Sequence, residues 1–363
     1  MSTPISIWLD CDTGHDDAFA ILLAAYNPKV KLLGISTVYG NASLSNTTYN
    51  TLAILKAIGR EDIPVYAGAS KPFCREPASA PDIHGESGLD GTTCLPAPTQ
   101  ESVITNTAVE AMYNALIATT KETSWLVLTG ALTNSALLFA IHPDLAEHLA
   151  GVSIMGGAIG GGFTDAPLGA LAGEGERFGN WTPWAEFNIY LDPESAHSVL
   201  IHPVIRTKTT LIPLDLTHQF IATVDVQQTA LHGHNHTVDG TDQVSLPTVR
   251  KLFFEILTFF ARTYAEVFGL TDGPPLHDPL AVAAVFAPEL FSDNGGERFE
   301  VTVITEGEHG SAEHVRSGSS ECGRTVAEKL PLGTPGVRIP RGLEVNKVWK
   351  MLDRCLTQAS VGI

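Results

Sequence analysis

The sequence predicts an α/β fold, in which a mostly parallel open sheet is flanked by helices as in a Rossmann-like core. Short apolar runs alternate with helical patterns through the first 210 residues, and such alternation is typical of βαβ units. The runs are apolar throughout, as expected of strands that helices cover on both faces. After residue 245 the helical patterns dominate.

The expected elements follow one another along the chain. Strands are expected at 5–10, 30–38, 124–130, 151–157 and 206–214, with a late strand at 299–307. Helices are expected at 16–27, 44–59, 132–141, 246–269, 278–290 and 343–356. The helix at 246–269 carries its apolar residues at roughly helical spacing. Together these elements build one parallel sheet with its connecting helices.

Three stretches rich in Gly, Pro or Ser interrupt this pattern, at residues 69–100, 156–185 and 306–340. Loops of this length in a compact domain are usually functional or mobile. No internal repeat and no linker divides the chain. We therefore expect a single domain over residues 1–363 with long active-site loops.

Composition and charge narrow the classes of partner. A chain of 363 residues with 44% hydrophobic content can bury a large core. Its formal charge of -18 would repel nucleic acid and anionic membranes. We also expect no signal peptide and no membrane span. The five cysteines include no Cys-x-x-Cys pair, so we expect a reducing compartment, the cytoplasm. The negative charge favours a neutral small molecule or a cation as ligand.

The segment DCDTGHDD, residues 10–17, follows the first expected strand. It places four carboxylates at the end of a strand where open α/β sheets bind their ligands. One aspartate could serve as a helix N-cap, but four would repel one another unless a cation gathers them. Oxygen ligands of this kind favour Ca²⁺ or Mg²⁺ over a transition metal.

Further polar residues are expected at the same edge of the sheet. Asn41, Thr129 and Met155 lie where other strands end. His277 and Asp278 begin a later helix, where an Asp N-cap followed by Pro is a common start, and this purely structural interpretation stays open. His277 also adds a group that titrates near neutral pH.

The segment GNWTPWAEFNIY supplies two amides and a carboxylate suited to holding vicinal hydroxyls. These are Asn180, Glu186 and Asn188. Each amide could instead cap a turn. Their expected convergence with the residues at the strand ends favours a binding site.

With these segments assembled, the sequence resembles the nucleoside hydrolase family, also called inosine-uridine preferring ribohydrolases. The matching segments are DCDTGHDDAFAILLA, STVYGN, DIHGESGLDG, LTGALTN, IMGGA, GNWTPWAEFNIYLDPESAH and HDPLAVA. They occur in the family's order up to about residue 285, and the match is to the group with a histidine before the last aspartate, here His277. The resemblance implies hydrolysis of the N-glycosidic bond of ribonucleosides, with uridine or inosine as substrate. It also implies a homodimer or homotetramer.

The resemblance implies roles for individual residues. Asp12 matches the metal-bound general base, and His277 matches the residue that faces the leaving base. The implied Ca²⁺ ligands are Asp12, Asp17, Asp278 and the Thr129 carbonyl. The implied substrate-binding residues are Asp16, Asn41, His84, Met155, Asn180, Glu186 and Asn188. Tyr264, on the long helix at 246–269, is a further candidate to reach the base, and these motifs leave the base preference open.

Two other classes of protein fit parts of the sequence. A haloacid-dehalogenase-like phosphatase would use Asp10 as nucleophile and Asp12 as acid and base, but the downstream lysine and acidic pair that it needs do not appear. A calcium-binding module would need an EF-hand loop, and that pattern is absent. The histidines of HGHNH, His232, His234 and His236, lie in a polar stretch that favours a solvated loop over a zinc site.

Overall fold

The computed structural model describes residues 3–168, 178–234, 248–310 and 320–361, together with two short strands at 170–171 and 175–176; His236 lies outside these residues. Its centre is a six-stranded parallel sheet in the order β3-β2-β1-β4-β5-β8. The strands are β1 (Ile5–Cys11), β2 (Val30–Thr37), β3 (Val65–Ala67), β4 (Ser124–Leu128), β5 (Gly151–Met155) and β8 (Thr209–Ile212). The predicted α/β fold is confirmed.

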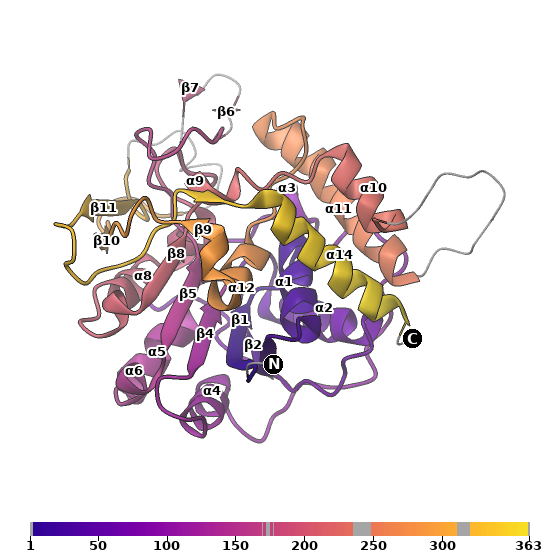
Figure 1. Cartoon of the computed structure of the whole chain (residues 1–363), viewed down its shortest axis with the longest axis horizontal. Helices are drawn as coiled ribbons and strands as arrows, with labels where there is room; N and C mark the ends of the chain where they lie inside the picture. The colour runs from indigo at the N-terminus through magenta and orange to yellow at the C-terminus, as the bar shows by residue number, and fades with distance from the viewer. Residues whose placement is uncertain are drawn as a thin grey trace.

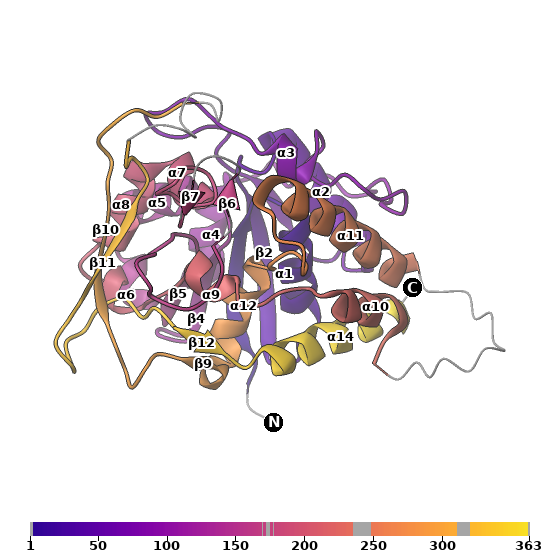
Figure 2. The ribbon, with the colours of Figure 1, turned by 90° about the horizontal axis from the view of Figure 1, so that it is seen from above.

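Helices cover both faces of this sheet (Figures 1 and 2). One face packs against α1 (His15–Tyr26), α2 (Leu44–Ala57), α11 (Thr248–Phe268), α12 (Asp278–Phe286) and α14 (Val345–Val361). The other face packs against α4 (Ala108–Ile117), α5 (Thr133–Ile141), α6 (Leu145–His148) and α8 (Pro193–Leu200). Among the described residues, no helix is both long and apolar enough to cross a membrane.

Strand β1 shows how the sequence fills both cores. Ile7, Leu9 and Cys11 belong to the core beneath α1, and Trp8 belongs to the core on the opposite face. Successive side chains of a strand point to opposite faces, so a strand buried on both sides needs an unbroken apolar run. The Trp8 indole donates a hydrogen bond to Ser36 Oγ (2.9 Å), which satisfies its one polar atom.

The late part of the chain corrects the expected loop at 306–340. It contains β11 (Thr325–Lys329), which pairs antiparallel with β10 (Phe299–Val303). The strand pattern of TVAEK is weak because the segment has no apolar run. Its last two side chains, Glu328 and Lys329, are exposed and therefore need not be apolar. The helix predicted at 278–290 ends early, at Phe286, and a 3₁₀ turn follows at Pro288–Leu290. Proline lacks the N–H that would continue the helix.

The remaining elements are short or lie in the loops. They are α3 (Pro81–His84), β6 (Ala170–Leu171), β7 (Gly175–Glu176), α7 (Phe187–Leu191), a 3₁₀ turn (Ile205–Thr207), α9 (Leu214–Thr217), α10 (Val224–His232), β9 (Phe291–Ser292) and β12 (Gly342–Leu343). β9 pairs with β12, and β6 with β7.

The strand order places a crevice at the middle of the sheet. From β1 the chain builds outward through β2 and β3, and it then returns to add β4, β5 and β8 on the other side. Open parallel sheets bind ligands where the order reverses, beyond the carboxyl ends of the strands. Here that point lies between β1 and β4.

Candidate active site

Four buried aspartates gather at the carboxyl end of β1. Asp12 follows the strand directly, Asp16 and Asp17 lie in the first turn of α1, and Asp278 begins α12. Carboxylate oxygens of Asp16, Asp17 and Asp278 all lie within 4.8 Å of one another. The N-termini of two helices meet here, and helix dipoles favour negative charge at that end.

The Asp12 carboxylate is tightly enclosed. Its Oδ2 accepts a hydrogen bond from the Asn41 backbone N–H (2.8 Å), whereas its buried Oδ1 has no hydrogen-bond partner among the described residues. A Cβ at Gly40 would lie 2.0 Å from Oδ2, and one at Gly130 would lie 2.9 Å from Oδ1. These glycines at the ends of β2 and β4 therefore leave just enough room for the carboxylate.

The electrostatics of the cluster indicate a cation. Burial, followed by repulsion from Asp17, raises the pKa of Asp12, and the same two causes raise the pKa of Asp16 to about 7. Burial and then the charges of Asp16 and Asp17 raise the pKa of Asp278. The protein alone thus disfavours simultaneous ionisation of these groups. An unpartnered buried oxygen beside three clustered carboxylates fits a metal ion held by oxygen ligands.

Residues at the ends of β2 and β4 are hydrogen-bonded to this cluster. Asp17 Oδ1 accepts from the Thr129 hydroxyl (2.9 Å), and Asp17 Oδ2 accepts from the Gly14 N–H (2.9 Å) and from Asn41 Nδ2 (3.1 Å). The Thr129 carbonyl accepts from Asn188 Nδ2 (2.9 Å). Strands from both sides of the crevice therefore contribute to one polar network.

Helix α7 forms a wall of the site. Glu186 is its N-cap, and its carboxylate accepts from the N–H groups of Asn188 (2.9 Å), Ile189 (3.1 Å) and Gly157 (2.9 Å). Asn180 Oδ1 accepts from the Phe187 N–H (2.9 Å). The capping role that the sequence left open for the amides is therefore present at Asn180, and Glu186 is a cap as well; both residues also line the cavity described next.

A small cavity lies above the carboxylates. Its lining includes ten of the predicted site residues: Asp16, Asn41, His84, Thr129, Met155, Asn180, Glu186, Asn188, His277 and Asp278. Asp12 and Asp17 do not line it but are hydrogen-bonded to Asn41, which does. A larger cavity of about 330 Å³ between α10 and α14 contains none of the predicted residues.

Three aromatic residues complete the lining: Phe187, Phe260 and Tyr264. Tyr264 is the further candidate that the sequence offers for reaching the base, whereas Phe187 and Phe260 are absent from the predicted site. Phe260 and Tyr264 are four residues apart on α11, one helical turn, so they share a face. The signal in the sequence is that spacing, but the apolar pattern of α11 gives an equally good reason for both residues to be buried in the core.

His277 is held at both ring nitrogens. Nδ1 lies 2.7 Å from the Thr217 hydroxyl, and Nε2 lies 2.8 Å from the Tyr264 hydroxyl. Burial lowers the pKa of His277 well below its usual value, so the ring is neutral. The family resemblance implies that His277 faces the leaving base; in the structure His277 lines the cavity and contacts Tyr264, which also lines it.

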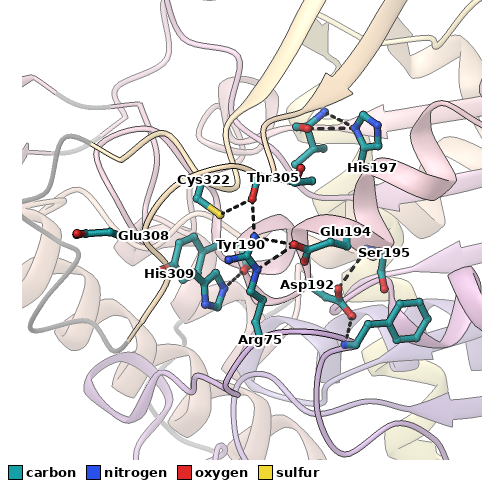
Figure 3. A network of polar contacts seen from close by, with 12 residues as sticks. Arg75, Tyr190, Asp192, Glu194, Ser195, His197, Thr305, Glu308, His309 and Cys322 are labelled. Atoms are coloured by element: carbon teal, nitrogen blue, oxygen red, sulfur yellow. Dashed lines mark hydrogen bonds and ion pairs between the residues drawn. The ribbon is translucent and has the colours of Figure 1, made fainter.

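The back of α7 is fixed by a second polar network, which joins the loop 69–100, the start of α8 and the segment after β10 (Figure 3). Arg75 donates to Glu194 Oε1 through Nε (2.9 Å) and Nη2 (2.6 Å), and also to the Thr305 carbonyl. His309 contacts the Tyr190 carbonyl through Nε2 (2.8 Å). The matching sequence motifs include Tyr190 and Glu194 but not their partners Arg75, Thr305 and His309.

The full sequence matches the family model described as inosine-uridine preferring nucleoside hydrolase over residues 7–350. The chain belongs to this family. The uridine nucleosidase of Saccharomyces cerevisiae is 43% identical over 281 residues, which are 77% of this chain and 75% of the relative. A pyrimidine-specific ribonucleoside hydrolase of Escherichia coli is 39% identical over 288 residues, 79% of this chain and 81% of the relative. The predicted hydrolysis of nucleosides is confirmed, and the phosphatase alternative is set aside.

Solved structures of nucleoside hydrolases share the fold. The purine-preferring ribonucleoside hydrolase from Gardnerella vaginalis superimposes with a TM-score of 0.77 at 24% identity, covering 98% of this chain and 99% of that one. A plant nucleoside hydrolase gives a TM-score of 0.74 at 25% identity, with the same coverage of both chains. The shared fold thus covers nearly the whole of both chains.

Proposed function

We propose that this nucleoside hydrolase acts on pyrimidine ribonucleosides, with uridine preferred, and that it depends on Ca²⁺. The observation that carries the metal-dependent mechanism is the unpartnered Asp12 Oδ1 beside the carboxylates of Asp16, Asp17 and Asp278. The pyrimidine preference is supported by the relatives named for uridine or for pyrimidine nucleosides at 43% and 39% identity.

Asp12, Asp17, Asp278 and the Thr129 carbonyl would hold the metal. These are oxygen donors, which Ca²⁺ prefers. When bound, the metal would lower the pKa of a water molecule and orient it. Asp16 lies in the same carboxylate cluster and also lines the cavity. Its position suits a contact to a ribose hydroxyl.

Asp12 would act as general base. The Asn41 N–H fixes Oδ2, so the carboxylate cannot rotate freely and would meet the water that the metal orients in one defined position. A positioned base of this kind contributes about 10²- to 10⁴-fold to the rate.

The ribose would be held between α1 and α7. Asp16 at the start of α1 lines the cavity, as do Asn180, Glu186 and Asn188 at and before the start of α7. Cleavage of a glycosidic bond passes through an oxocarbenium-like state. The buried carboxylates place negative charge next to the ring that becomes positive, and the amides orient its hydroxyls.

The departing base would receive its proton from Tyr264. The Tyr264 hydroxyl lies at the cavity and contacts His277 Nε2, and the Thr217 hydroxyl contacts the other ring nitrogen. With Nδ1 accepting from the Thr217 hydroxyl, the Nε2–H of neutral His277 would donate to the Tyr264 oxygen, which leaves the phenolic proton free for the departing base. The phenolate that this transfer forms would be reprotonated from solvent after the products leave. Phe260 and Phe187 offer aromatic surfaces against which a pyrimidine can pack.

The test is a panel of uridine, cytidine, inosine and adenosine, with ribose release measured before chelation, after chelation and after addition of Ca²⁺ or Mg²⁺. We expect uridine to give the highest kcat/KM, and we expect Ca²⁺ to restore the activity that the chelator removes. A higher kcat/KM for inosine would contradict the base preference, and chelator-resistant hydrolysis would contradict the metal.

We further propose that the enzyme works in a reducing compartment such as the cytoplasm, as a homodimer or homotetramer. All five cysteines are free thiols, in accord with the first proposal. The second rests on the family resemblance alone. Light scattering after size-exclusion chromatography measures the mass of the assembly, and a monomer would contradict the proposed state.

A further inference from the structure

Two buried histidines contact each other at the edge of the cavity. His15 Nδ1 lies 3.1 Å from His84 Nδ1, and His15 Nε2 lies 2.9 Å from the backbone carbonyl oxygen of Asp90. The His15 ring stacks on Phe259 and Phe260, with interplanar angles of 6° and 2°. Of the two histidines, only His84 lines the cavity.

These contacts determine where the protons sit. A carbonyl oxygen can only accept, so His15 Nε2 carries a hydrogen. Both rings are buried among aromatic side chains, an environment that keeps them uncharged. A neutral ring has one N–H, so His15 Nδ1 is bare and His84 Nδ1 must donate to it. The remaining nitrogen, His84 Nε2, is then also bare.

We propose that His15 is a positioning residue that fixes the tautomer of His84, so that His84 offers a bare Nε2 to the substrate. In that state His84 accepts a hydrogen bond from an O–H or N–H group of a nucleoside and cannot donate one. Among the described residues, no hydrogen bond to His84 Nε2 is found within the protein. The identity of the ligand rests on the proposed function, whereas the assignment of the tautomer rests only on the contacts of the two histidines.

The backbone around the pair is built for this contact. Gly14 allows the close approach, because a Cβ there would lie 2.6 Å from His84 Nδ1. The Asp90 N–H donates to the His84 carbonyl (3.2 Å), which closes the turn that carries the His15 acceptor. The Thr263 hydroxyl donates to the Ile83 carbonyl (3.0 Å) and fastens α3 to α11. Both partners of His15 are therefore held in place.

The tautomer of His84 also determines which residue can protonate the leaving base. Because His84 has no proton to give, the proton for the leaving base must come from another group, and Tyr264 is the donor proposed above. His84 instead recognises a donor on the substrate. The family motif around His84 does not reveal this direction, since either tautomer is compatible with the same residue.

The tautomer can be measured without any substrate. Protein labelled with ¹⁵N-histidine gives two-bond ¹H–¹⁵N correlations that distinguish the Nδ1–H form from the Nε2–H form, and a His84→Asn variant identifies the His84 signals. We expect the Nδ1–H form for His84 in the wild-type protein. An Nε2–H form would overturn the proposal, even if no variant of His15 folds.

Two nearly isosteric variants separate hydrogen bonding from packing. His15→Asn places an amide oxygen near the lost Nδ1, whereas His15→Leu removes the acceptor, and both lose the stacked ring. We expect His84 to keep the Nδ1–H form in His15→Asn and to lose it in His15→Leu. Identical tautomers of His84 in the two variants would overturn the role of His15.

Kinetics provide a second measurement. We expect kcat/KM for uridine to fall by about tenfold in His15→Leu, the value of one hydrogen bond, and to stay near the wild-type value in His15→Asn. Equal losses in both variants would show a packing role and overturn the proposal. Failure of the proposed function has a different signature, because the wild-type protein would then release no ribose while its His84 spectrum is unchanged.

Discussion

Gly40→Ala tests whether the position of Asp12 limits catalysis. The added Cβ would lie 2.0 Å from Asp12 Oδ2 and 3.0 Å from Leu191 Cδ1. Carbon and oxygen atoms do not approach within about 3 Å in proteins, so the carboxylate must shift by roughly 1 Å. The same Oδ2 accepts the Asn41 N–H hydrogen bond, and a shift weakens that contact too. A displacement of this size at a catalytic group costs about 10²-fold in rate.

The assay is kcat/KM for uridine, with the melting temperature of each protein measured alongside. The matched control is Gly342→Ala, because the nearest atoms to its new Cβ lie at 3.9 and 4.0 Å. Neither glycine adopts a positive φ, so alanine adds no backbone strain at either position. The reasoning is refuted if Gly40→Ala folds normally and retains activity within about threefold of Gly342→Ala.

Three further predictions concern the carboxylates and the ion pairs. Asp12→Asn should lower kcat by about 10²- to 10⁴-fold, and an active variant would contradict this. The same change should raise the melting temperature of the chelated protein, since it removes a buried charge that Asp17 repels. Arg75→Met should lower the free energy of unfolding in urea by about 1–2 kcal/mol, and less in a Glu194→Gln background; equal losses would show that the pair is not coupled. Glu297 accepts from Lys329 and Arg341, and these contacts, the Lys329 one first, lower its pKa from 4.5 to about 2. Its stabilising effect is therefore complete above pH 4.5 and lost as the pH falls toward 2, so the difference in melting temperature between wild type and Glu297→Gln should shrink over that range.

The convergence of polar residues at one edge of the sheet follows from the sequence for a geometric reason. Asp12, Asn41 and Thr129 follow three parallel strands, and the register of the sheet brings the ends of those strands together. Once the strands are recognised, the convergence of these residues follows without knowledge of any loop. Strand β11 is missed because a half-exposed edge strand of five residues carries little periodic signal.

Other contacts around the cavity are ones that no local pattern specifies. His15 meets His84 across 69 residues, and Arg75 meets Glu194 across 119. Each pair joins a residue of the segment 69–100 to a residue in the first turn of a helix, and no pattern in the sequence indicates which helix that segment meets. Tyr264 illustrates the same limit, because its place in the apolar face of α11 is equally well explained by core packing.

Glu186 shows why a structural and a functional interpretation of one residue need not compete. An ionised carboxylate offers about four acceptor sites, and three backbone N–H groups of α7 and the loop after β5 already donate to Glu186. Those bonds fix the carboxylate in place and oppose the effect of burial, which raises its pKa. About one acceptor site is then left for a ligand, so Glu186 can receive a single hydroxyl hydrogen bond. The cap is thus what gives the remaining oxygen lone pair a defined direction toward the cavity.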